Sequence, residues 1–277
     1  MSEKQQIKPI LTAGLFPELL DGLLDLLKSL SAEEWKAPTN GEWSVKDVVV
    51  HLLGGDFGII SWKRDKYSEF VEVGDWDELV GLINGINDNW IKNGARFSPR
   101  LLIELLQFTG EKISQIFQDL DPHALGVPVD WVGADPMPIW VDVAREFTER
   151  WHHQQHIRDA VGKPGFKEPK YLEPVMDAFM LALPRTYKDE EAETGTKIQI
   201  ELTGGLEKKW LLEKENSNWC LYTGDWGECQ AHISLDADAA WRIFTKGLTV
   251  DQALSFVSMQ GNLRLAQKVL ETVSIIA

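Results

Sequence analysis

The first part of the chain repeats apolar side chains at the spacing of α-helices. Leucines recur every three or four positions over residues 17–30, so this stretch predicts an amphipathic helix with Pro17 in its first turn. Ser44 is a suitable N-cap for a second helix, with Asp47 in the first turn. This helix is expected to extend over residues 44–67, although a pair of glycines weakens it near the middle.

Three further helices are predicted before the pattern changes. Residues 77–93 form a shorter helical stretch, residues 98–116 form a long helix that starts at Ser-Pro, and residues 138–162 form another long helix. The segment DPHALGVPVDWVGADPMP is interrupted by Pro and Gly and predicts a loop. Four long helices in one part of the chain indicate a four-helix bundle.

After residue 165 the chain changes to short runs with strand character. One more helix is expected over residues 171–185, followed by the acidic loop DEEAETGT. Strands are predicted in KIQIEL, KKWLLEK, WCLYTG and HISLDA, and the tail returns to helix in three stretches. Strands followed by helices indicate an α+β domain. We therefore expect two domains, an all-α bundle over residues 1–165 and an α+β domain over residues 166–277.

Composition restricts the partners of these domains. With 277 residues and 44% hydrophobic side chains, the chain can bury a core in each domain. A net charge of −15 argues against nucleic acid and anionic membranes as partners, because both require clustered Lys and Arg. We find no signal peptide and no membrane-spanning apolar run. The only two cysteines, Cys220 and Cys229, exclude a disulfide framework, and we expect a cytoplasmic protein.

Histidines are scarce and concentrated in one predicted helix. Of the six in the chain, three lie within five residues, at His152, His153 and His156. Glu149 precedes His153 by four positions, so the two side chains project from the same face of the helix. His51, inside the second predicted helix, can supply a third ligand. Two imidazoles and one carboxylate suit zinc or a similar divalent ion and leave one coordination position open.

The spacing of these residues also allows a structural interpretation. A single histidine in a helix is usually a hydrogen-bonded core or boundary residue, and Glu/His pairs one turn apart are common on helix surfaces. Two apolar stripes run along this helix, so its phase does not choose among the three histidines. The choice of His153 rests on the carboxylate of Glu149 one turn before it.

Two segments of the helical part resemble a known family. EWSVKDVVVHL and REFTERWHHQQHIRDAVGKPG resemble the DinB-like bundle of the mycothiol-dependent maleylpyruvate isomerase family. The tail, which ends TKGLTVDQALSFVSMQGNLRLAQKVLETV, resembles the sterol-carrier-protein-like domain that follows the bundle. In that family a histidine of the second helix and a Glu-x-x-x-His pair of the fourth bind zinc. The matching positions are His51, Glu149 and His153, so the resemblance implies a zinc site there.

The resemblance also implies a cofactor and a reaction. The family uses a low-molecular-weight thiol such as mycothiol, whose thiolate a metal ion would favour. Addition of the thiolate to an activated double bond creates a rotatable single bond, and elimination returns the trans product. The expected function is a metal- and thiol-dependent isomerase or S-transferase that acts on a small electrophilic substrate. Cys220 and Cys229 are then ordinary structural residues.

Several alternatives remain open. Arg242 and Lys246 are weaker candidates for holding an anion, and Arg158 either contacts an acidic substrate or forms a structural ion pair. Asp47 either orients His51 or serves its own helix as an N-terminal carboxylate. A carrier or sensor of a small apolar ligand, with a structural metal, would fit the sterol-carrier resemblance and the twelve tryptophans. A metal-dependent hydrolase would require the same open coordination position.

Overall fold

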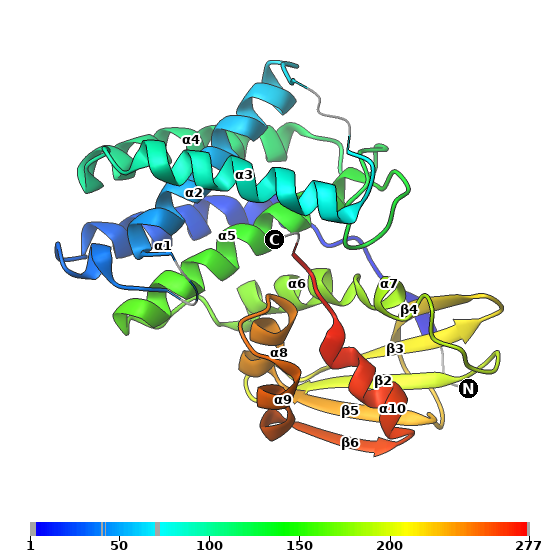
Figure 1. The fold of residues 1–277 in the computed structure, drawn as a ribbon. Helices are drawn as coiled ribbons and strands as arrows, with labels where there is room; N and C mark the ends of the chain where they lie inside the picture. Colours follow the sequence, from blue (N-terminus) through cyan, green and yellow to red (C-terminus); the bar gives the residue numbers. More distant parts are fainter. Residues whose placement is uncertain (1–3, 40, 42, 70–72, 276–277) are drawn as a thin grey trace. The chain divides into compact units, whose positions relative to one another are not determined.

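The computed structural model describes residues 4–39, 41, 43–69 and 73–275 (Figure 1). Contacts divide these residues into two compact units, each assembled from segments that are distant in sequence. The helical unit contains residues 11–122 and 146–166, and the sheet unit contains residues 4–10, 123–145 and 167–275. A helical N-terminal part and a C-terminal part with a mixed sheet confirm the predicted two-part architecture. The predicted domain boundary near residue 165 stays a prediction.

All five helices predicted in the first part of the chain are present. They are α1 (Phe16–Lys28), α2 (Val45–Ile59), α3 (Trp76–Gly94), α4 (Pro99–Asp119) and α5 (Ile139–Val161). A π-helical turn (Ile60–Arg64) continues α2, and a long loop precedes α5, as expected. Helix α5 contributes residues 139–145 to the sheet unit and its remaining residues to the helical unit.

Local hydrogen bonds explain where two of these helices begin. The Ser44 hydroxyl accepts a hydrogen bond from the Asp47 backbone N–H, and the Asp47 carboxylate accepts one from the Ser44 backbone N–H at 2.9 Å. This reciprocal capping box satisfies donors that the first turn of α2 leaves open. The Ser98 hydroxyl caps α4 by accepting a hydrogen bond from the Leu101 backbone N–H at 3.3 Å, and Pro99 occupies the first position of the helix.

Leucine and valine side chains form the core of the helical unit. Helix α4 packs against α1 and α2, and α3 packs against α2. Phe16 of α1 makes edge contacts with Phe117 of α4 and Phe147 of α5, with ring centroids 4.8 and 5.6 Å apart. From residue 151 to 158 every side chain of α5 is buried, including the polar ones. The two apolar stripes of α5 therefore reflect a helix that is covered on several faces.

The sheet unit contains a six-stranded mixed sheet. Its strands are β1 (Lys4–Gln6), β2 (Lys197–Thr203), β3 (Lys208–Glu215), β4 (Asn218–Gly224), β5 (Ala231–Asp236) and β6 (Val257–Gly261), in the order β1-β4-β3-β2-β5-β6. Only the β2–β5 pair is parallel among the described pairs. Its helices are α6 (Pro169–Met180), α7 (Leu183–Thr186), α8 (Ala237–Phe244), α9 (Val250–Ala253) and α10 (Leu263–Lys268).

The four predicted strands are confirmed as β2 to β5, but the sequence predicts neither edge strand. The three residues of β1 are all exposed and polar, so they carry no alternating pattern, and β6 is a short, largely exposed strand. The helix predicted over residues 171–185 is divided into α6 and α7. Within the described residues, no helix combines the length and the apolar composition that crossing a bilayer requires.

Candidate metal centre

Helices α2 and α5 bring the three predicted ligands together. The Nε2 atom of His51 lies 2.9 Å from Oε1 of Glu149, and Nε2 of His153 lies 3.1 Å from the same oxygen. One ligand atom from each residue lies within 4.8 Å of those from the other two. The sequence separation between His51 and Glu149 is 98 positions, so only the packing of the two helices creates this group. Its role as a metal site stays a prediction.

Burial sets the protonation of the group. Burial, with the neighbouring His152, lowers the pKa of His153 to about 3, and burial also lowers the pKa of His152. For Glu149 burial acts to raise the pKa, but the electrostatic interaction and hydrogen bond with His153 and the hydrogen bond with His51 hold it well below its ordinary value. At neutral pH an ionised carboxylate therefore faces a neutral imidazole, which is the protonation state that metal coordination requires.

The centre remains open to solvent on one side. The Glu149 side chain keeps 31% of its accessible surface, whereas His51 keeps 14% and His153 10%. The Glu149 side chain therefore keeps part of its surface in contact with solvent, while the two imidazoles are held among packed side chains. Val50 and Leu52, on either side of His51, are both buried and fix this turn of α2.

Two residues that the sequence analysis did not identify complete the surroundings of His51. Asn87 of α3 places its Oδ1 atom 3.1 Å from Nδ1 of His51. The ring of Trp43 lies beside both imidazoles, with centroids 5.0 Å from His51 and 6.2 Å from His153. No spacing rule connects Asn87 to His51, which is 36 positions away. Trp43 directly precedes the Ser44 cap, but that position gives no sign of its contacts with the two imidazoles.

The surroundings of His51 fit a metal ion. Both ring nitrogens of His51 face oxygen atoms, Oδ1 of Asn87 and Oε1 of Glu149. A neutral imidazole has one N–H, so it can donate to only one of them. If Nδ1–H donates to Asn87, the lone pair of Nε2 is directed toward the carboxylate, and a cation between them would satisfy both. Metal-binding histidines usually hold their second nitrogen in this way.

Asp47 is engaged in the start of its helix. Its carboxylate accepts hydrogen bonds from the backbone N–H of Ser44 at 2.9 Å and from the Ser44 hydroxyl at 2.6 Å. These contacts support the capping interpretation of Asp47, and Asn87 occupies the position next to His51 that Asp47 was considered for.

Two of the three basic candidates, both arginines, have side-chain contacts of a structural kind. Buried Arg158 donates to the backbone carbonyls of Gly22 and Lys163, at 3.1 and 3.2 Å. Arg242 in α8 donates to Asp238 at 3.0 Å. Lys246 follows α8 with a backbone φ of 61°. These contacts support a structural role for both arginines, and a catalytic role for any of the three stays untested.

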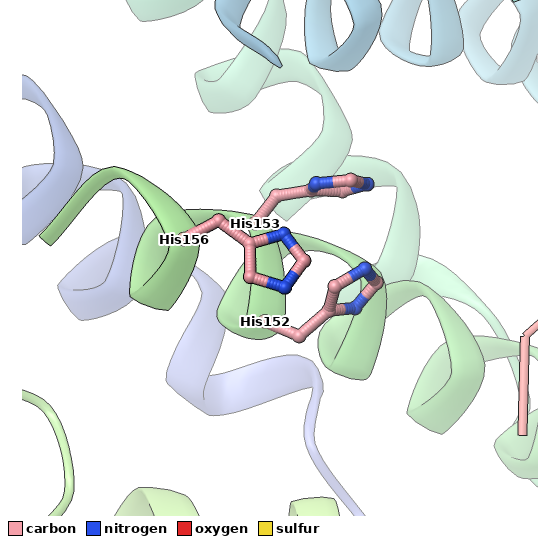
Figure 2. Close-up of side chains that lie close together, drawn as sticks. All are labelled: His152, His153 and His156. Atoms are coloured by element: carbon pink, nitrogen blue, oxygen red, sulfur yellow. The ribbon is translucent and has the colours of Figure 1, made fainter. Parts of the chain in front are cut away.

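A second group of histidines lies next to the first. The rings of His152, His153 and His156 gather on one side of α5 (Figure 2). The centroid of the His152 ring lies 4.1 Å from that of His153 and 5.2 Å from that of His156. His153 belongs to both groups, since a ligand atom from each of these three residues also lies within 4.8 Å of the other two.

Comparisons with known proteins identify a family and a shared fold. Residues 16–158, more than half of the chain, match the family model described as mycothiol maleylpyruvate isomerase N-terminal domain. The crystal structure of the mycothiol-dependent maleylpyruvate isomerase has a TM-score of 0.55 and 11% sequence identity, over 92% of this chain and 93% of that chain. A variant of that enzyme with one histidine replaced by alanine gives the same TM-score and coverage at 10% identity.

No curated protein sequence matches the chain. At such low identity the solved structures show a shared fold, and the family model shows common descent over most of the helical unit. The chain therefore belongs to the mycothiol-dependent maleylpyruvate isomerase family.

Proposed function

We propose that the chain is a metal-dependent enzyme that uses a low-molecular-weight thiol, of which mycothiol is the first choice, to isomerise a small electrophile of the maleylpyruvate type. Membership of the isomerase family supports the reaction class. The observation that carries the proposal is the convergence of His51, Glu149 and His153 on one point that solvent can reach. A related S-transfer reaction would use the same centre.

The donor set of the centre matches zinc. Two imidazole nitrogens and one carboxylate oxygen are the ligands of several catalytic zinc sites, which keep a fourth position for water or substrate. A divalent ion held by these residues would favour the thiolate form of a bound thiol, and the thiolate is the nucleophilic form. Burial raises the pKa of both Cys220 and Cys229, so neither thiol of the chain is activated.

Each residue of the centre has a distinct task in this proposal. Glu149 supplies the negative charge, because its pKa is held low. His153 supplies a lone pair without competition from protons, because its ring stays neutral well below pH 7. Asn87 keeps the His51 ring in one orientation, and Trp43 covers both imidazoles with an apolar surface.

The same proposal includes the finer description of the two parts. The order of the long helices, with the ligands on the second and the last, supports a DinB-like bundle over residues 1–165. The mixed sheet with α8 to α10 supports a sterol-carrier-protein-like domain over residues 166–277. A truncated chain that ends at residue 165 and still binds zinc would support this division, and an unfolded one would contradict it.

Zinc binding and isomerisation should fail together when the centre is changed. Variants His51→Ala, Glu149→Gln and His153→Ala are compared with His232→Ala, a control in β5 of the sheet unit. Zinc affinity is measured by competition with a chelator, and conversion of maleylpyruvate to its trans isomer is followed with mycothiol, with another thiol and without thiol. We expect zinc to bind at least tenfold more weakly and activity to fall at least 100-fold in the three variants only.

Two outcomes would contradict the proposal. One is isomerisation by the wild type that is equally fast without any thiol. The other is full activity in the Glu149→Gln variant, because the reaction would then not depend on the charged ligand.

A further inference from the structure

The histidines next to the candidate metal centre are buried more deeply than a solvated helix face would be. His152 is 2% exposed, His153 8% and His156 9%. Figure 2 shows their three rings gathered on the same side of α5. Buried polar side chains normally have hydrogen-bond partners, so the partners of these rings decide what the group can do.

Two of the rings present acceptor nitrogens to the protein interior. The Nδ1 atom of His152 lies 2.9 Å from the carbonyl oxygen of Thr148, which can only accept, so Nδ1 carries the proton and Nε2 is left as an acceptor. Nε2 of His153 lies 3.1 Å from the Glu149 carboxylate and donates to it when no ion is bound. The Nδ1 atom of His153 is then an acceptor. It is fully buried and has no hydrogen-bond partner among the residues that the structure describes.

Neighbouring acceptors of this kind need a donor or a cation. The rings of His152 and His153 are 4.1 Å apart between centroids, and both side chains are buried. His156 adds a third ring, 5.4 Å from that of His153. One nitrogen from each of the three rings lies within 4.8 Å of the others. Three imidazole nitrogens suit zinc, copper or nickel.

We propose that His152, His153 and His156 form a second metal-binding position that is occupied in alternation with the position at His51, Glu149 and His153. A neutral imidazole offers one lone pair, so His153 can bind an ion at only one position at a time. Its Nε2 serves the first position and its Nδ1 serves the second. The carboxylate of Glu149 makes the first position the preferred one, and the three neutral ligands of the second hold the ion when the first is incomplete.

The inference rests on the proposed function in one respect, because both metal positions use His153. The other two ligands of the second position, His152 and His156, are not part of the first. The test of the second position therefore begins from the His51→Ala/Glu149→Gln variant, in which only His153 of the first position remains. His156→Gln is added to this variant, and His232→Gln is added in a matched control. Zinc binding is measured by equilibrium dialysis, and the absorption spectrum of bound cobalt reports the number of nitrogen ligands.

We expect the double variant to retain one zinc ion per chain, bound more weakly than in the wild type. Addition of His156→Gln should weaken the remaining binding at least tenfold, whereas addition of His232→Gln should not. Zinc binding that is absent from the folded double variant, or unchanged by His156→Gln, would overturn the proposal. Circular dichroism establishes that the variants fold, and Glu149→Gln alone replaces the double variant if that variant unfolds.

Anomalous diffraction from zinc-soaked crystals provides a second measurement and separates the two proposals. A peak among His152, His153 and His156 in the Glu149→Gln variant supports the second position. A wild-type peak at Glu149, with no peak anywhere in that variant, overturns the second position and leaves the proposed function intact. A wild-type peak among the three histidines alone supports the second position and contradicts the proposed function.

Discussion

At the scale of single residues, Asn87 determines how firmly His51 is held. Its Oδ1 atom lies 3.1 Å from Nδ1 of His51, where it fixes the ring orientation that directs Nε2 toward Glu149. Loss of such a partner typically costs 10- to 100-fold in metal affinity. We therefore expect Asn87→Ala to weaken zinc binding by about 10- to 100-fold without unfolding the protein. Titration with a competing chelator measures the zinc affinity of the variant and of the wild type.

Asn89 provides a matched control for this prediction. It is exposed on the same helix, two positions further on. Asn89→Ala should leave zinc affinity unchanged. Equal affinities in the Asn87→Ala and Asn89→Ala variants would show that the contact with His51 does not orient the ring.

A second residue-scale prediction concerns pH. The pKa of His153 is about 3 in the folded chain, against an ordinary value of 6.5, because the ring is buried. Between these values the unfolded chain binds a proton that the folded chain does not. The free energy of unfolding of the metal-free protein should therefore fall as pH drops from about 6.5 toward 3, by about 1.4 kcal/mol per pH unit for this one group.

Urea denaturation with a chelator present, at about pH 7 and about pH 5, measures this slope. His153→Gln removes the titrating group and should make the decline shallower, whereas His232→Gln should not. If both variants keep the wild-type slope, the stability of the folded chain does not depend on the neutral state of His153.

At the scale of elements, the capping box at the start of α2 stabilises the helix that carries His51. The Ser44 hydroxyl and the Asp47 carboxylate satisfy backbone donors of the first turn. Replacement of an N-cap serine by alanine costs about 1 kcal/mol, in a range of about 0.5 to 2. We expect Ser44→Ala to lower the free energy of unfolding by about this amount. Thermal or urea denaturation checks the effect.

A substitution at the start of α2 also distinguishes the two roles considered for Asp47, which are capping the helix and orienting His51. As a capping residue, Asp47 should affect stability but not zinc affinity, so Asp47→Ala should destabilise the protein while zinc binds as in the wild type. A drop in zinc affinity of tenfold or more, with unfolding unaffected, would instead assign Asp47 to the metal centre.

The elements also show what could be predicted from the sequence. Ser44, Ser98 and Pro99 mark helix starts by chemistry within one turn, and α2 and α4 begin where these residues predict. The strand β1 pairs with β4, which is more than 200 positions away, and its polar residues carry no sign of that partner. Edge strands of this kind depend on a neighbour that local patterns do not reveal.

The candidate centre was predictable only in part, for a related reason. Glu149 and His153 are one turn apart, so helix geometry alone pairs them. From the residues alone His51 was only a possible third ligand on another helix, and the resemblance to a family supported the choice, because the contact crosses from α5 to α2. Asn87 and Trp43 have no local signal, since their contacts with His51 arise only after the helices pack.

At the scale of the whole molecule, zinc binding at the candidate centre should raise the free energy of unfolding of the chain. The predicted ligands come from α2 and α5, and the unfolded chain does not hold residues 98 positions apart together. An ion that binds only the folded chain stabilises it by about 2.7 kcal/mol when its free concentration is 100 times the dissociation constant. For a protein of this size that corresponds to a rise of roughly 5 °C in the unfolding midpoint. Differential scanning calorimetry with and without zinc measures the shift.

The variant that should lose this stabilisation is His51→Ala/His153→Ala, because His153 belongs to both proposed positions. Its midpoint should be the same with zinc and with a chelator, whereas His232→Ala should show the full wild-type shift. Hydrogen exchange places the effect within the molecule: zinc should protect the amides of α2 and α5 first, since these helices carry the ligands. An equal zinc-induced shift in the wild type and the double variant would mean that the ion binds outside these histidines, and the link between the centre and the stability of the fold would be lost.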